Sequence, residues 1–349
     1  MVKKITVQNI IIGENYPTFI IAEIGMNHNG DVELGKKIIK AAVECGCDAA
    51  KFQIFTAEKL VTNDAETYGN EDGHLPKYQQ AMYKKHELSK SQWIELKKYC
   101  DELGIIFFAS AWDEENVDLL EEIGGAMIKF GAADITHLPL LEYAAQKRKP
   151  IIISTGMSTI EETDEAIKTI TAHTDDIVIL HCVSAYPAKA EDANLRSMLS
   201  LKKYGFPIGF SDHTPGILAD TVAVALGANV IEKHFTIDKK IPGIDHHLSL
   251  NPEEMKRMVD EIRQVEKMLG SSEKIVTESE KETRMMARRS IISNCYIPKG
   301  VILTKEMIVI KRPGYGIHPR EYNKIIGKRA CQDIKADTLL TLDMLEENT

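Results

Sequence analysis

Two histidines each end a short apolar segment of the sequence. His213 ends "IGFSDH" (208–213), and His234 ends "NVIEKH" (229–234). Taken singly, each has the character of a loop or core histidine that is hydrogen-bonded to the backbone. Together, at the ends of neighbouring strands, they would supply two ligands of an open site for a divalent cation. Mn²⁺ is the first expectation, and Mg²⁺, Co²⁺ and Zn²⁺ are the alternatives.

Further polar side chains interrupt segments that otherwise have the composition of buried strands. They are Glu23, Lys51, Gln53, Lys129, Ser154, Ser211 and Glu232. Residues two apart share one face of a strand, so Lys51 and Gln53 are expected to point the same way. A buried lysine is costly without a partner anion, and any one of these residues could belong to a structural ion pair. The whole set, placed near strand ends, predicts a pocket for a phosphate or a carboxylate.

Strand-like and helix-like segments alternate over the first 270 residues. This order predicts an α/β fold, a (β/α)8 TIM barrel, with an open doubly wound sheet as the structural alternative. Barrel enzymes place their chemistry at the carboxyl ends of the strands, which would bring the polar residues together. Gly46 and Gly104 lie where helices are expected to end in the left-handed conformation. The expected strands cover 18–24, 49–55, 104–110, 126–131, 150–156, 176–182, 206–212 and 229–235, and helical patterns cover 34–46, 91–104, 159–173 and 251–270.

Shorter elements flank the predicted barrel. Residues 4–19 have the pattern of a β-hairpin with its turn near 13–15, which would close one end of the barrel. We therefore expect a barrel domain over 1–270 and a charged linker over 271–288. The remaining residues, 289–349, are expected to form a small β-rich domain, because "IPKGVILTKEM" and "IKADTLLTLDM" are near-repeats within it.

Composition excludes several classes of protein. The 349 residues include 52 acidic and 43 basic side chains, and this net charge of −9 argues against a nucleic-acid binder. No apolar segment approaches the roughly 18 residues of a membrane-spanning helix, and the first 13 residues lack a signal-peptide pattern. The six cysteines are scattered, as in a cytoplasmic protein with reduced thiols.

A series of motifs runs in order along nearly the whole chain. They are "FIIAEIGMNHNGD", "AAKFQ", "IIISTGMST", "LHCVSAYPA", "IGFSDHTPG", "ALGANVIEKHFTID" and "GIDHHLSLNPEEM". Together they resemble the sialic acid synthase family. The later motif "VIKRPGYG" resembles the antifreeze-like (SAF) C-terminal domain of the bacterial members. The resemblance implies the TIM barrel and the small β-rich SAF domain that the patterns also predict.

The resemblance also implies a reaction. An N-acetylneuraminate synthase is a transferase that condenses phosphoenolpyruvate with N-acetylmannosamine or a related N-acyl hexosamine, and with water. The products are a nine-carbon 2-keto sugar acid and phosphate, which leaves by C–O cleavage. His213 and His234 would hold a cation that polarises the aldehyde of the open-chain sugar.

The family implies roles for the other residues as well. Glu23 and Asp134 would be the acid–base groups, and their assignment could be exchanged. Lys51, Lys129, Ser154 and Ser211 would bind phosphoenolpyruvate, and Gln53, Ser184, Tyr186 and Asp245 would bind the sugar. Glu232 is expected near the metal. Arg312 would reach the N-acyl group from the SAF domain of the partner chain, in a domain-exchanged homodimer.

The sequence departs from the commonest bacterial pattern at three places. It has Ser110-Ala111 after the third strand, Ala132 and Asp134 after the fourth, and Cys182-Val183-Ser184 before Tyr186. Ala111 and Ala132 each lack a hydroxyl, and Asp134 is one methylene shorter than glutamate. Several alternatives stay open: a legionaminic or pseudaminic acid synthase, a spore-coat polysaccharide synthase, and a 9-phosphate synthase that uses the 6-phosphosugar. More distant alternatives are a metal-dependent pyruvate aldolase and a non-catalytic carbohydrate-binding protein.

Overall fold

The computed structural model describes residues 2–67 and 76–346. The chain divides into two compact units, Met1–Gly270 and Ser271–Thr349. Each unit is described by itself below.

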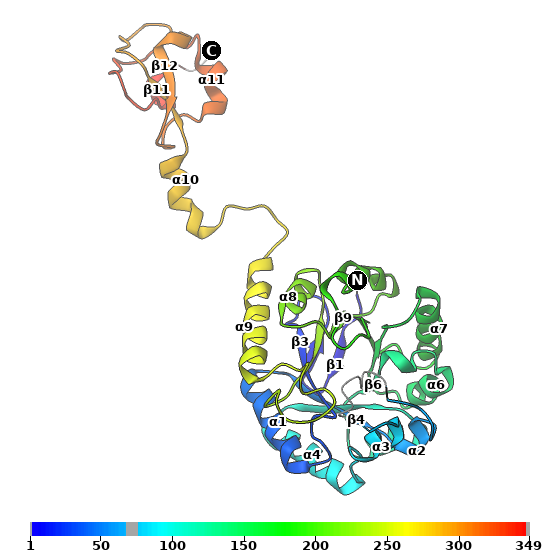
Figure 1. Cartoon of the computed structure of the whole chain (residues 1–349). Coiled ribbons are helices and arrows are strands. Elements are labelled where there is room, and N and C mark those ends of the chain that lie inside the picture. Colours follow the sequence, from blue (N-terminus) through cyan, green and yellow to red (C-terminus); the bar gives the residue numbers. More distant parts are fainter. Residues whose placement is uncertain (1, 68–75, 347–349) are drawn as a thin grey trace. The chain divides into compact units, whose positions relative to one another are not determined.

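Eight parallel strands of the first unit form a closed barrel in the order β10-β3-β4-β5-β6-β7-β8-β9 (Figure 1). Strand β10 pairs with β3, so the sheet has no free edge and the predicted TIM barrel is confirmed over the open sheet. The strands are β3 (Phe19–Gly25), β4 (Ala49–Ile54), β5 (Ile106–Ala111), β6 (Ile128–Phe130), β7 (Ile151–Ser154), β8 (Ile177–Cys182), β9 (Ile208–Asp212) and β10 (Val230–His234).

Helices surround the barrel and cover the outer face of the strands (Figure 1). Gly46 and Gly104 end helices with φ of 84° and 72°, which confirms the predicted left-handed caps. A 3-10 helix over Leu195–Tyr204 lies between β8 and β9. The helices are α1 (Val32–Cys45), α2 (Ala57–Leu60), α3 (Gln79–Lys84), α4 (Lys90–Leu103), α5 (Glu114–Glu122), α6 (Leu138–Gln146), α7 (Ile160–Thr171), α8 (Leu218–Ala225) and α9 (Pro252–Leu269). Among the described residues, no helix is long and apolar enough to cross a membrane.

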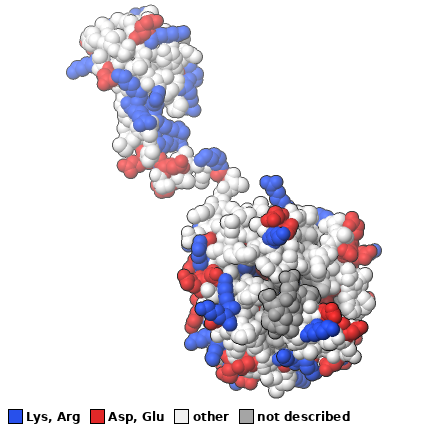
Figure 2. Space-filling model, viewed as in Figure 1, with Lys and Arg blue, Asp and Glu red and all other residues white. Residues whose placement is uncertain are grey.

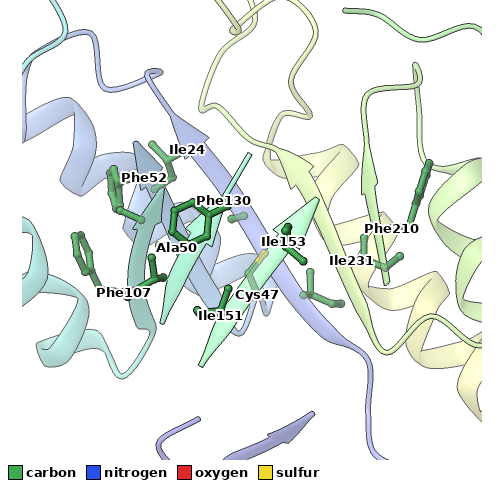
Figure 3. Packing of buried hydrophobic residues seen from close by; sticks show 14 of the residues in the cluster. Ile24, Cys47, Ala50, Phe52, Phe107, Phe130, Ile151, Ile153, Phe210 and Ile231 are labelled. Atoms are coloured by element: carbon green, nitrogen blue, oxygen red, sulfur yellow. The ribbon is translucent and has the colours of Figure 1, made fainter. Parts of the chain in front are cut away.

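The main hydrophobic core lies between the strands and the helices. Alternate strand residues face it, such as Phe52 on β4 and Phe107 on β5, whose ring centroids are 5.3 Å apart (Figure 3). The intervening residues, such as Ala49 and Ile106, face the barrel interior and belong to a second hydrophobic cluster. Both faces of every barrel strand are therefore covered.

A hairpin closes the amino-terminal end of the barrel, as predicted. Its strands are β1 (Ile5–Val7) and β2 (Ile10–Ile12), and Ile5, Val7 and Ile12 pack in the interior cluster with Phe19 and Ile21. The predicted position of the hairpin turn, near 13–15, is wrong, because the two strands are joined at Gln8 and Asn9, with Ile5 paired to Ile12 and Val7 to Ile10. The chain also turns at 13–16, but outside the hairpin. Gln8 adopts a φ of 51°, an uncommon conformation for a residue other than glycine.

The second unit is small and has its own core. Its elements are α10 (Lys281–Ala287), β11 (Ser290–Ser293), β12 (Ile308–Lys311) and α11 (Tyr322–Ile325), so the charged stretch after Gly270 contains a helix. The near-repeats meet where they begin: the backbone N–H of Ile297 donates to Ile334, and that of Ile334 to Ile297, each at 2.8 Å. Each repeat ends in a 3-10 turn, at Lys305–Met307 and at Leu342–Met344.

Candidate active site

The barrel interior changes from apolar to polar along its length. On β5, Ile106 and Phe108 face the hydrophobic interior cluster, and Ser110 follows them on the same side. On β4, Lys51 and Gln53 follow Ala49 in the same way. The polar half lies at the carboxyl ends of the strands, where barrel enzymes hold their active sites.

Two lysines and two glutamates form a connected group in this polar half. Lys51 Nζ lies 2.7 Å from Glu23 Oε2 and 3.8 Å from Glu232 Oε2. Lys129 Nζ lies 3.7 Å from Glu232 Oε1 and donates to Ser154 Oγ at 2.7 Å. All four charged side chains are buried. Four strands of the barrel thus converge on one polar cluster.

Glu232 lies between the two lysines. Its Oε1 also accepts a hydrogen bond from Ser211 Oγ at 2.8 Å. Burial would raise the pKa of Glu232, but Lys129 and Lys51 outweigh it and hold the pKa below its usual range. Glu232 therefore belongs to the lysine group, and its expected place near the metal stays a prediction.

The pKa values of the two lysines shift in opposite directions. Burial lowers the pKa of Lys129, although Glu232 attracts its charge. The same desolvation acts on Lys51, but Glu23 and Glu232 outweigh it, and the pKa of Lys51 is raised. The site can therefore hold positive charge out of water, which is what an anionic ligand requires.

Glu23 has the environment of a proton-transfer group. Burial raises its pKa to about 7, against the opposing effect of Lys51. Its Oε1 accepts a hydrogen bond from Gln53 Nε2 at 2.8 Å. A Cβ on Gly25, which has a φ of 53°, would lie 3.1 Å from Glu23 Oε1 and 3.2 Å from Gln53 Nε2. A glycine at this position therefore leaves room for both side chains.

His213 and His234 lie together, with ring centroids 5.4 Å apart. His213 Nδ1 lies 2.8 Å from the carbonyl oxygen of Val183, a partner that orients the ring and leaves Nε2 for a ligand. His234 Nδ1 is buried without a hydrogen-bond partner among the described residues, 3.8 Å from Asp245 Oδ2. Burial lowers the pKa of His213 and, more strongly, that of His234, so both rings are neutral, as metal ligation requires.

These donors fit an open metal site rather than a closed one. Two neutral imidazoles and nearby carboxylate oxygen suit a divalent cation that keeps other positions for water or substrate. Within 2–67 and 76–346, three or more His, Cys, Asp or Glu side chains are nowhere gathered as a complete metal cluster.

The remaining predicted residues surround this pair at the strand ends. The ring of Tyr186 lies 4.2 Å from that of His213 and 6.2 Å from that of His234. Asp245 follows β10, and burial raises its pKa to about 6. Lys239 and His247, together with Pro187, Pro215, Gly216 and Leu248, line a hollow of about 150 Å³ formed by the loops after β8, β9 and β10.

Asp134 and Ser184 each have a polar atom without a hydrogen-bond partner among the described residues. These atoms are Asp134 Oδ2 and Ser184 Oγ, and both are buried. Burial raises the pKa of Asp134 to about 6. A Cβ on Gly156 would lie 2.4 Å from Ser184 Oγ and 3.0 Å from Ala132 Cβ, so these residues line one place in the site. Ala132 adds no polar group there.

Arg312 belongs to the second unit. It follows β12 directly and is exposed. Its expected role toward a partner's barrel stays a prediction.

Sequence reasoning missed a second charged group at the same strand ends. Asp212 and Lys233 are buried and make an ion pair. They were detectable, since a charge on the helix-covered face of a barrel strand is as unusual as one inside it.

Charges on the outer surface are mixed. Figure 2 shows acidic and basic side chains interspersed around the visible face of the barrel unit, with uncharged surface between them. The described residues on this face form no basic stripe of the kind that tracks a nucleic-acid backbone.

Comparisons with known proteins identify the family. The NeuB family model matches residues 38–274, and the SAF domain model matches 288–346. The chain is 42% identical over 342 residues to N,N'-diacetyllegionaminic acid synthase of Legionella pneumophila, which covers 96% of each chain. It is 35% identical over 352 residues to human N-acetylneuraminate-9-phosphate synthase, covering 97% of this chain and 95% of the relative.

A solved structure agrees with these relatives. The crystal structure of N-acetylneuraminic acid synthetase from Leptospira borgpetersenii superposes with a TM-score of 0.74 at 37% identity, over 81% of this chain and 95% of that one. The resemblance seen in the motifs is thereby confirmed. The chain belongs to the NeuB family, with a barrel of the sialic acid synthase type followed by a SAF domain.

Proposed function

We propose that this protein condenses phosphoenolpyruvate with an N-acyl hexosamine and water, giving a nine-carbon 2-keto sugar acid and phosphate. The observation that carries the proposal is the buried group of Lys51, Lys129, Glu23 and Glu232 beside two neutral histidines, in a chain of the NeuB family. The legionaminic acid and N-acetylneuraminate-9-phosphate synthases among its relatives support an N-acylated sugar as the acceptor.

Phosphoenolpyruvate would bind to the lysine group. Lys51, Lys129, Ser154 and Ser211 offer ammonium and hydroxyl donors to its phosphate and carboxylate. Because these donors are held out of water, they also stabilise charge that develops as phosphate leaves. The lysines exceed what a single pyruvate carboxylate would need, which favours this substrate over pyruvate and an aldolase reaction.

The sugar would bind on the side of the histidines. His213 and His234 would hold a divalent cation, most simply Mn²⁺, which supplies Lewis-acid polarisation of the sugar aldehyde when bound. Tyr186, Asp245 and Gln53 would contact the hydroxyl groups, and Ser184 has an unpaired hydroxyl for the same purpose. Arg312 of the SAF domain would contact the N-acyl group in a domain-exchanged homodimer.

Two carboxyl groups could move the protons. Attack by C3 of phosphoenolpyruvate leaves positive character at C2, where water adds before phosphate departs. Glu23, with a pKa of about 7, can accept the proton of that water and release it at neutral pH. Asp134, with a pKa of about 6, is the other acid–base candidate.

Sugar-dependent release of phosphate tests this function. The enzyme with Mn²⁺ and phosphoenolpyruvate would be given N-acetylmannosamine, its 6-phosphate, or a 2,4-diacetamido-6-deoxy hexose. Release with one of these sugars, abolished by EDTA and restored by Mn²⁺, is expected. Equal activity after exhaustive chelation would contradict the metal role, and pyruvate-dependent product without phosphate would establish an aldolase instead.

A further inference from the structure

A buried charged group lies on the outer side of β9 and β10, behind the two histidines. It consists of Asp212, Lys233 and Asp220, whose exposed fractions are 1%, 2% and 0%. Asp212 and Lys233 are register partners on the paired strands, and Asp220 belongs to α8. None of the three has a place in the proposed reaction.

The contacts of this group tie together the ends of both strands. Lys233 Nζ pairs with the carboxylate of Asp212 and donates to the carbonyl oxygen of Thr214 at 2.7 Å. Asp212 in turn accepts from the backbone N–H of Thr214 at 2.7 Å and from its hydroxyl at 3.0 Å. Asp220 Oδ2 lies 3.6 Å from Lys233 Nζ and adds a contact from the helix.

The sequence positions of these contacts matter. His213 is the residue between Asp212 and Thr214, and His234 directly follows Lys233. The residues on both sides of His213 therefore contact the residue that precedes His234. One ion pair and one hydrogen bond link the two segments that present the imidazoles. Two further hydrogen bonds join Asp212 to Thr214 across His213.

We propose that Asp212 and Lys233 are positioning residues, which fix the spacing of His213 and His234 for a divalent cation. The inference rests on the proposed function for the metal role of the histidines. A buried ion pair adds little net stability over apolar side chains of the same volume, so packing alone does not account for this group. If the two main-chain segments are held in place, the distance between the two imidazoles is fixed. Residues that support metal ligands in this way affect the affinity of the site for its metal.

Mn²⁺ binding without substrates tests the proposal. The dissociation constant would be measured by calorimetry, with electron paramagnetic resonance counting free Mn²⁺, for the full chain and for Asp212→Asn/Lys233→Met. This double variant removes both charges and keeps the volumes similar. We expect Mn²⁺ binding to weaken by about 10-fold to 100-fold. An unchanged dissociation constant in the folded variant would overturn the proposal.

Asp48→Asn is the matched control. Asp48 belongs to a partly buried group at the opposite end of the barrel, where its Oδ2 accepts from the N–H of Ile20 at 2.8 Å and lies 3.5 Å from Arg263 Nη2. The control is expected to lower the unfolding temperature and leave Mn²⁺ binding unchanged. If Asp48→Asn weakens Mn²⁺ binding as much as the double variant does, the effect is general loosening and the proposal is wrong.

A milder variant covers the case in which the double variant does not fold. Thr214→Val removes only the hydroxyl bond to Asp212 and is expected to weaken Mn²⁺ binding several-fold. An unchanged dissociation constant for this variant, when the double variant is unfolded, would also reject the proposal. Sugar-dependent phosphate release by the wild-type chain is measured separately, so failure of the proposed function is distinguishable from failure of this inference.

Discussion

Lys51 and Glu23 form the shortest ion pair of the polar cluster. Their Nζ and Oε2 atoms are 2.7 Å apart, and both side chains are buried. Breaking such a pair leaves one charge unpaired, which costs about 3–5 kcal/mol of stability. For each variant of these residues, the kinetic constants and the free energy of unfolding must therefore be measured together.

Lys51→Met is expected to lower kcat/KM for phosphoenolpyruvate by about 10²-fold to 10³-fold, because it removes a charged donor from the anion pocket. Steady-state phosphate release measures this change. Lys36→Met is the control, since Lys36 pairs with Glu33 and Glu95 at the surface and its replacement should leave the kinetics unchanged. Wild-type kcat/KM in a folded Lys51→Met variant would contradict the anion pocket.

Sequence reasoning identified three of the four charged residues of the polar cluster because charged residues stand out in apolar strands. Glu23, Lys51 and Lys129 were predicted on this ground, and the structure brings them into one cluster. The place of Glu232 between the lysines could not be predicted. That contact crosses the barrel interior and depends on the stagger of strands that are not neighbours.

Among the elements, the loop after β3 holds a buried histidine. His28 is fully buried, its ring packs edge-on against Trp93 at 5.7 Å, and its Nδ1 accepts from the N–H of Gly30. Burial lowers the pKa of His28 from 6.5 to about 3. Between these two pH values the unfolded chain binds a proton that the folded chain does not, so the contribution of His28 to stability is lost as the pH falls.

His28→Phe is expected to remove this acid sensitivity. Below about pH 6 the free energy of unfolding of the wild-type chain should fall more steeply than that of the variant, by about 1 kcal/mol per pH unit. Denaturant unfolding between pH 7 and pH 5 measures both curves. Parallel curves would show that His28 takes up its proton without unfolding.

The hairpin is the element that closes the barrel at the end away from the site. Ile12→Ala should lower the free energy of unfolding by about 2–5 kcal/mol, because Ile12 is fully buried in the interior cluster. Kinetic constants should stay unchanged below the unfolding temperature. Thr6→Ala, at an exposed position of the same hairpin, should change stability by no more than about 0.5 kcal/mol. Equal losses from the two variants would contradict the role of the hairpin as a plug.

The hairpin also shows why a turn is harder to predict than a strand. Gly13 and Asn15 have the composition of a turn and do lie in one, yet the two strands of the hairpin are joined at Gln8 and Asn9. Burial of Ile5, Val7 and Ile12 on one face fixes the register. This register imposes a φ of 51° on Gln8, so the burial of the three apolar side chains outweighs the backbone preference of glutamine.

At the scale of the whole molecule, we predict that the SAF domain of the partner chain completes each active site. On this prediction, Arg312→Ala would impair only the SAF contribution, and Glu23→Gln would impair only the barrel. In a mixed dimer with exchanged domains, one barrel is intact and receives an intact Arg312. Mixing the two inactive variants after dissociation should therefore restore one of the two sites in each mixed dimer, which is about one site in four after random reassociation of equal amounts.

The control for this complementation is Arg320→Ala, at another exposed arginine of the same unit, which should be active alone. Sedimentation would confirm that the mixed chains form dimers. Mixed dimers that stay inactive would show that each barrel uses its own SAF domain.

The central claim is that the polar end of the barrel cleaves the C–O bond of phosphoenolpyruvate during condensation with a sugar. The most direct measurement uses phosphoenolpyruvate labelled with ¹⁸O at the bridging oxygen, with Mn²⁺ and the accepted N-acyl hexosamine. The account predicts sugar-dependent phosphate that carries the label, together with a nine-carbon 2-keto acid. Unlabelled phosphate, or labelled phosphate released without sugar, would contradict it.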